Sequence, residues 1–190
     1  MEEGNIDRRR LASIVFGYDA FSLIHGLFLA KSELAGGRLR IERALSSFIE
    51  ASQVQVAASG GVKNDHVNPS GDTKKGFGNV PFQRDEYTGE IVAYFSLDLA
   101  EIRGFALPVP ATRLLVALAL YKITGFLEHP MRLRTACDLE LASPPIVKRP
   151  DSFVLPAFAD LQKAVPAWIS ECKNLFRGEG GVTRVSYQKG

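Results

Sequence analysis

Basic side chains and hydrogen-bond donors gather in one glycine-punctuated stretch of the chain, residues 57–86. The candidate phosphate contacts in it are Lys63, Asn64, His66, Lys74, Lys75 and Arg84. Ammonium and guanidinium groups bind phosphate oxygens, and glycines let a backbone turn sharply or pass close to a ligand. This composition predicts a long loop over residues 59–89. Long loops in compact domains are usually functional or disordered, and the apolar Phe77 and Phe82 argue against disorder.

Two alternating stretches add paired arginines. Arg38 and Arg40 share one strand face, and Arg132 and Arg134 share another, although a solvated face would show the same pattern. Together with the loop they would form a groove that follows a phosphate backbone, with aromatic side chains available to stack on bases. The whole chain has a formal charge of only +2. Any nucleic-acid contact must therefore come from local clustering of the lysines and arginines.

Hydrolytic, metal and nucleotide chemistry have weaker support in the sequence. Ser59, Asp65, His66 and Ser70 lie close together, but there is no nucleophile-elbow pattern, and Asx-turns explain the same residues. His66 with Asp65 and Asp72 could hold an ion, yet three donors on a loop match no metal motif. The Gly60-Gly61 pair lacks the offsets of a phosphate-binding Walker loop. We therefore expect no catalytic residue, metal or cofactor.

Hydrophobic periodicity predicts an α+β protein with a ferredoxin-like or RRM-like antiparallel sheet and helices on one face. We expect strands at residues 11–17, 38–43, 54–58, 90–99 and 131–141. We expect helices at residues 20–30, 44–51, 111–128 and 157–176, the last of them split by Pro166. Residues 1–143 would then form the main domain with its thumb-like loop, and residues 144–190 a linker and a helical extension.

The composition of the chain also indicates the cellular compartment to expect. The chain has 190 residues, of which 46% are hydrophobic, and this suits a packed core. Cys137 and Cys172 give neither a disulfide framework nor zinc-ligand spacing, so a reducing, cytoplasmic setting is expected. The N-terminus has no signal-peptide pattern. The most apolar run, residues 114–121, is shorter than the roughly 20 residues needed to span a bilayer, so no membrane contact is expected.

Four strings carry a resemblance to a known family: GYDAFSLIHGLFL (17–29), GRLRIERALSSFIEA (37–51), SGGVKNDHVNPSGDTKKGFGNVPFQRDEYTGE (59–90) and LRTACDLEL (133–141). They resemble a CRISPR-associated protein of the RAMP superfamily, the Cas-seven-type backbone subunit of the type I-U (or I-G) Cascade complex. The resemblance covers roughly residues 11–141. It also implies that this chain lacks the N-terminal part that the family carries ahead of this region.

The resemblance implies an RRM-like palm and a non-catalytic subunit, repeated along one CRISPR RNA, that grips the guide for target DNA recognition. Partners would be the CRISPR RNA, target DNA through the guide, other Cascade subunits and further copies of the chain. Base pairing would read sequence, while the protein reads shape and phosphate. The RNA contacts carried over are Arg38, Arg40, Lys63, Asn64, His66, Lys74, Lys75 and Arg84.

Two alternatives remain open from the sequence. One is a RAMP-type ribonuclease in which Asp65, Asp72 or His66 promotes strand cleavage, as a loop aspartate does in the backbone subunits of type III complexes. The other is a protein-interaction scaffold with no nucleic-acid role. Cleavage of complementary RNA would distinguish the first from a non-catalytic subunit, and co-purifying RNA would argue against the second.

Overall fold

The computed structural model describes residues 7–30, 37, 39–53, 55–134, 137–178, 182–184 and 186, with the backbone alone at 55–59, 83–88, 133–134 and 137–138. Its elements are α1 (Arg8–Tyr18), α2 (Phe21–His25), β1 (Leu27–Leu29), β2 (Leu39–Ile41), β3 (Leu45–Ala51), β4 (Gln55–Lys63), η2 (Thr73–Lys75), β5 (Val80–Thr88), β6 (Ile91–Leu97), α3 (Leu99–Gly104), α4 (Val109–Glu128), β7 (Met131–Arg134), β8 (Cys137–Leu139), α5 (Phe158–Glu171) and η3 (Lys173–Leu175).

The chain divides into two compact units. Unit 1 comprises Met1–Ser46 and Phe95–Gly190, and unit 2 is Ser47–Tyr94. The hydrophobic core belongs to unit 1, where α1, α2, α3, α4 and α5 contribute most of its buried residues. Unit 2 holds most of β3 and β6 and the whole β4–β5 hairpin. The predicted loop residues 59–89 thus belong to a unit other than that of the main core.

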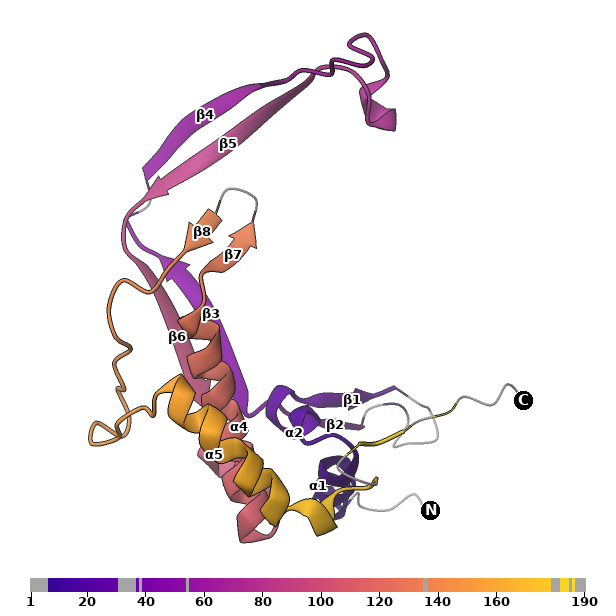
Figure 1. The fold of residues 1–190 in the computed structure, drawn as a ribbon, viewed down its shortest axis with the longest axis vertical. Helices are drawn as coiled ribbons and strands as arrows, with labels where there is room; N and C mark the ends of the chain where they lie inside the picture. The colour runs from indigo at the N-terminus through magenta and orange to yellow at the C-terminus, as the bar shows by residue number, and fades with distance from the viewer. Residues whose placement is uncertain are drawn as a thin grey trace. The chain divides into compact units, whose positions relative to one another are not determined.

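Helix α4 is the central element of unit 1, and its prediction is confirmed. Pro110 lies in its first turn, where a missing N–H costs nothing, and extended backbone at His129, ahead of Pro130, ends it. Leu114 and Leu115 are fully buried, and α4 packs along α5 (Figure 1). Within the described residues, α4 is long and apolar enough to cross a membrane by length and composition, a test that buried core helices also pass.

The predicted strand at residues 11–17 is wrong, because this segment is part of α1. The Asp7 carboxylate accepts hydrogen bonds from the backbone N–H groups of Arg9 and Arg10, each at 3.0 Å, and so caps the helix. Ala12 and Phe16 lie one turn apart and are buried, while Ile14 is exposed. The branched apolar residues suggested a strand, but helical spacing places the buried pair on one face.

Residues 20–30 begin as the predicted helix and then change direction. Helix α2 ends at Gly26, whose φ of 87° is costly for other residues, and β1 follows. A Cβ at Gly26 would lie 3.1 Å from the Ile41 carbonyl oxygen. Strand β1 pairs antiparallel with β2, which places Phe28 opposite Arg40. The predicted alternation in β2 is confirmed, since Ile41 is buried and Arg40 exposed.

The predicted helical turns at residues 44–51 are also wrong, because this segment is β3. It pairs with β6, the strand predicted at residues 90–99. Phe48 in β3 stacks on Tyr94 in β6 with ring centroids 4.7 Å apart. Long-range pairing thus overrides the weak local preference of a serine-rich segment.

The predicted loop at residues 59–89 is largely a β-hairpin, which corrects the expectation from composition. Strand β4 pairs antiparallel with β5, from Gln55 opposite Thr88 to Lys63 opposite Val80, and only residues 64–79 form the connecting loop (Figure 1). The composition excluded a buried strand, but a solvent-exposed ribbon needs no apolar face. The partner strand supplies the hydrogen bonds that a loop would lack.

Two other expectations change near the C-terminus. Residues 131–141 form the β7–β8 hairpin rather than one strand. Helix α5 continues through Pro166. This proline is exposed, so the carbonyl that loses its hydrogen bond can be solvated, and the buried Leu161 and Val165 lie on a helix that packs against α4. The α+β class is confirmed, but the described strands form four separate two-stranded sheets, with no continuous ferredoxin-like sheet among them.

Candidate nucleic-acid interface

The hairpin of unit 2 carries most of the predicted contacts. Lys63 is the last residue of β4, and Asn64, His66, Lys74 and Lys75 lie in the loop that follows, all with exposed side chains. The loop, residues 64–79, is called the tip loop below. The structure therefore brings five of the eight predicted residues to one end of the hairpin.

Asp65 organises the tip loop through its carboxylate. Its Oδ1 accepts hydrogen bonds from the backbone N–H groups of Val67 and Asn68, at 2.9 and 3.1 Å. Its Oδ2 accepts from the N–H of Gly78 at 2.9 Å, which ties the two ends of the loop together. The side-chain oxygen of Asn79 in turn accepts from the N–H of Asp65 at 2.9 Å. The Asx-turn explanation of this aspartate is confirmed.

A short 3₁₀ turn, η2, carries the lysine pair. The carboxylate of Asp72 accepts from the N–H of Lys74 at 3.0 Å, and Gly76 ends the turn with a φ of 83°. The Asp72 carbonyl accepts from the N–H groups of Lys75 and Phe77, at 3.0 and 3.2 Å. Local backbone bonds therefore fix the positions from which both lysine side chains extend into solvent.

Two glycines allow the loop to close on itself. Gly78 is buried with a φ of 84°, and a Cβ there would lie only 2.4 Å from the Gly71 carbonyl oxygen. A Cβ at Gly71 would lie 2.5 Å from the Cβ of Phe77. The tip loop is thus a compact, internally bonded structure, which lowers the ordering entropy that binding would cost.

The hairpin stem has an aromatic ring laid over a glycine. Gly61 pairs with Phe82, and a Cβ at Gly61 would lie 3.2 Å from the ring edge of Phe82. The ring covers the place where a side chain is missing, which explains how a strand accommodates Gly60-Gly61. The ring is still 53% exposed, so one of its surfaces remains open.

The backbone donors also shift the titration of Asp65. Bonds from Asn68, Gly78 and Val67 favour the ionised carboxylate and hold its pKa below the ordinary value of 3.8. A carboxyl with a lowered folded pKa stabilises the folded loop above its unfolded pKa, and this contribution disappears as pH falls through the folded pKa. We therefore expect the tip loop to stay intact from neutrality to about pH 4 and to loosen below the unfolded value of 3.8.

This expectation is measured by following the backbone amide shifts of Val67, Asn68 and Gly78 in an NMR pH titration. The Asp65→Asn variant is the control, because it lacks the titrating carboxyl and should not show this transition. A common midpoint above pH 3.8 in the natural sequence would contradict the assigned hydrogen bonds.

The other three predicted residues lie outside the tip loop in the sequence. Arg40 lies on β2 in unit 1, is exposed, and has its Nε 3.6 Å from the Glu42 carboxylate. Arg84 lies in β5 opposite Ser59, and its side chain is outside the described part. Arg38 lies outside the described residues altogether. The residues predicted to line the groove therefore belong to both units of the chain.

The stretch that contains the hairpin has no net positive charge. Between residues 57 and 86, the four lysines and arginines are matched by four carboxylates, those of Asp65, Asp72, Asp85 and Glu86. Two of these carboxylates, on Asp65 and Asp72, are bonded to backbone N–H groups. Any anion contact at the tip loop therefore depends on the local arrangement of Lys63, Lys74 and Lys75.

The tip loop uses the Asp65 carboxylate for its own hydrogen bonds. Both carboxylate oxygens of Asp65 are engaged by backbone donors, which gives this residue an architectural role. Across the described residues, no group of three or more His, Cys, Asp or Glu side chains is arranged to hold a metal ion.

The hairpin also has exposed apolar side chains, and from the sequence a role in stacking on bases was expected of the aromatic ones alone. Val62, Phe77 and Phe82 are about half exposed, and Val67 is 91% exposed. An isolated two-stranded hairpin is marginally stable in water, and exposed apolar groups favour contact with a partner. The alternation of apolar residues in β4 and β5 was the available sequence signal, but it was assigned to a loop.

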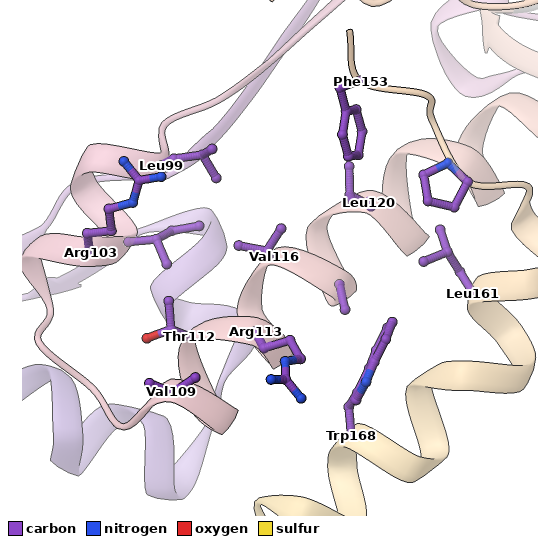
Figure 2. A pocket seen from close by; sticks show the side chains of 13 residues that line it. Leu99, Arg103, Val109, Thr112, Arg113, Val116, Leu120, Phe153, Leu161 and Trp168 are labelled. Carbon is purple, nitrogen blue, oxygen red and sulfur yellow. The ribbon is translucent and has the colours of Figure 1, made fainter. Parts of the chain in front are cut away.

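Unit 1 has a separate apolar hollow of about 480 Å³ beside α3, α4 and α5. Figure 2 shows Trp168 and Leu161 of α5 on one side of it and Val116 and Leu120 of α4 on the other. Its lining contains two arginines but no carboxylate, histidine or cysteine. The hollow therefore suits apolar contact rather than acid–base or nucleophilic chemistry.

Comparison with known proteins gives one family match. Residues 2–56 match the family described as CRISPR-associated protein GSU0053 (Cas_GSU0053). The matched part extends from the N-terminal segment through α1, α2, β1, β2 and β3 into β4, and the tip loop lies beyond it. No curated protein matches the chain. The match supports a CRISPR-associated protein with a role in CRISPR defence.

Proposed function

We propose that this chain is a non-catalytic, guide-RNA-binding backbone subunit of a cytoplasmic CRISPR surveillance complex of the Cascade type. The observation that carries the proposal is the tip loop, an internally bonded structure that presents Lys63, Lys74 and Lys75 at the end of a two-stranded hairpin. The family match at residues 2–56 supports the CRISPR context. The Cas-seven-type assignment rests on the resemblance given above.

The tip loop suits contact with a phosphate backbone rather than with particular bases. Lysine ammonium groups are point charges that bind phosphate without reading sequence. The backbone bonds of Asp65 and Asp72 hold the loop in one form before binding. In the proposed complex, base pairing by the guide selects target DNA, and the protein supplies shape and charge.

The exposed apolar residues of the hairpin support assembly into a larger complex. Phe77 and Phe82, about half exposed, and Val67 are without cover in the single chain. Apolar surface of this kind is stabilised when a partner covers it. We assign that cover to a neighbouring copy along the guide RNA and to other subunits.

The proposal predicts how RNA affinity depends on salt. Each phosphate neutralised on a single strand contributes about −0.7 to the slope of log K against log salt concentration. Replacing Lys63, Lys74 and Lys75 together by glutamine should therefore reduce the slope by about 2. The measurement is a filter-binding titration of single-stranded CRISPR RNA at several salt concentrations.

A charge-matched control distinguishes the tip loop from general cationic attraction. Replacing the exposed Arg149, Lys163 and Lys173 of unit 1 by glutamine changes the net charge equally. This variant should keep the slope of the natural sequence. Equal slopes in the tip variant and the natural sequence would overturn the proposal that the tip loop holds the RNA.

The ribonuclease alternative needs a variant that leaves the loop intact. Asp65→Ala is unsuitable because it removes three backbone bonds of the tip loop. His66→Ala is better suited, because the exposed imidazole can be removed without touching these bonds. Cleavage of complementary RNA with magnesium, lost in the His66 variant, would replace the non-catalytic proposal with an enzymatic one.

A further inference from the structure

The junction of α1 and α2 in unit 1 exposes two aromatic rings, each with a cation over its face. Tyr18 is 57% exposed and Phe21 is 40% exposed. The Nζ of Lys122 lies 4.5 Å from the centroid of the Phe21 ring, and the Cζ of Arg177 lies 6.0 Å from that of Tyr18. These four side chains are called the aromatic patch below.

Arg177 is held in place by its surroundings. Its backbone N–H donates to the Gly17 carbonyl at 2.7 Å, and the preceding Phe176 stacks on Phe16 with ring centroids 5.4 Å apart. The side chain crosses α1 at Gly17, where an added Cβ would lie 2.9 Å from the Cγ of Arg177. The Thr183 hydroxyl donates to the Tyr18 carbonyl at 3.3 Å. These contacts fix the base of the Arg177 side chain, and they place its guanidinium beside the Tyr18 ring.

The other charged groups at the junction leave the patch cationic. Asp19 lies between the two rings in sequence, but its carboxylate accepts from the Phe21 N–H at 2.9 Å and the Ser22 hydroxyl at 2.7 Å. Lysines and arginines outnumber carboxylates in unit 1, whereas carboxylates are in the majority in unit 2. The surplus positive charge of the chain is thus on the unit that carries the patch.

We propose that the aromatic patch is a second contact site for single-stranded polynucleotide. Bases stack on the ring surfaces of Tyr18 and Phe21 that the two cations leave exposed, while Lys122 and Arg177 contact the adjoining phosphates. Proteins that hold single strands combine aromatic stacking surfaces with cations, and stacking tolerates every base. An acidic peptide would use the cations but has no planar bases for the rings. The inference rests on the proposed function only in that the ligand is RNA, because the patch lies in unit 1 and the tip loop in unit 2.

The test measures binding of a labelled 20-nucleotide single-stranded RNA to the full chain by fluorescence anisotropy. One variant carries Tyr18→Leu and Phe21→Leu, and a second carries Lys122→Gln and Arg177→Gln. The first variant loses two stacking rings and should bind at least about tenfold more weakly. The second loses two phosphate contacts, so it should also bind more weakly, with a slope of log K against log salt concentration reduced by about 1.4. Phe153→Leu, at an exposed phenylalanine of unit 1 outside the patch, should leave the affinity unchanged.

Ultraviolet crosslinking gives a readout that does not depend on stability. Trypsin releases Tyr18 and Phe21 on one peptide, residues 11–31, and the first part of the tip loop on another, residues 64–74. The proposal expects RNA adducts on the first peptide, lost in the double-leucine variant. Thermal melting of each variant checks that unit 1 is still folded.

The outcomes separate the two proposals. Unchanged affinity in both patch variants, with adducts only on residues 64–74, would overturn the patch and leave the tip loop standing. Weaker binding in the patch variants with an unchanged salt slope in the tip-loop variant would support the patch and overturn the tip-loop grip. Competition by polyglutamate as strong as that by unlabelled RNA would overturn the assignment to polynucleotide. No RNA binding by the natural sequence would overturn both.

Discussion

Replacing Gly78 by alanine is expected to disrupt the tip loop and to abolish its contribution to RNA affinity. The new Cβ would lie 2.4 Å from the Gly71 carbonyl oxygen, a distance that real Cβ atoms essentially never show, so the backbone must move. Movement there breaks the bond from the Gly78 N–H to the Asp65 carboxylate, which joins the two ends of the loop. Hydrogen exchange of residues 64–79 should rise strongly, while that of α4 in unit 1 stays unchanged.

Gly76→Ala is the matched control, because it separates the effect of the clash at position 78 from the effect of placing alanine at a positive φ. Gly76 has nearly the same φ, 83° against 84°, but a Cβ there meets nothing within 4 Å. This variant carries only the cost of a left-handed residue, about 1–2 kcal/mol. It should therefore keep most of the protection from exchange and most of the RNA affinity. Equal behaviour of the two variants would show that closure of the loop at Gly78 does not matter.

The segments predicted correctly from sequence are those in which the residues that begin and end an element agree with its hydrophobic periodicity. Pro110 and the His129–Pro130 step mark the two ends of α4, and the buried run between them leaves no competing period. The alternation in β2 is equally local. Where local signals conflict with tertiary pairing, prediction fails. The serine-rich β3 becomes a strand through its partner β6. Helix α5 continues through Pro166 because its buried residues pack against α4.

The candidate site was predictable in its residue types but not in its construction. The lysines of the tip loop were identifiable because phosphate contact requires their charge. The bond from Gly78 to Asp65 was not, since it joins residues on opposite sides of the loop and depends on a carboxylate orientation. The aromatic patch is even harder to predict from sequence, because Arg177 contacts Tyr18 only when the segment after η3 packs on α1. No local pattern encodes a contact of that sequence separation.

Phe16→Ala is expected to cause a large loss of stability in unit 1. Phe16 is 2% exposed and stacks on Phe176, so its removal leaves a cavity between α1 and the segment after η3. Truncation of a buried phenylalanine costs about 3–5 kcal/mol. For a chain of this size the melting temperature should fall by about 10 °C, which calorimetry or circular dichroism would measure. Ile14→Ala is the control in the same helix, since its side chain is 41% exposed and should cost far less.

The same substitution links the core to the aromatic patch. Phe176 immediately precedes Arg177, and loss of its stacking partner releases the segment that holds the guanidinium beside Tyr18. Phe16→Ala should therefore weaken RNA binding at temperatures where unit 1 is still folded, whereas Ile14→Ala should not. Phe16→Leu, which keeps an apolar side chain in the core, should recover most of the stability and only part of the RNA affinity. If Phe16→Ala lowers the melting temperature but leaves RNA affinity intact, Arg177 does not need its docked position to act.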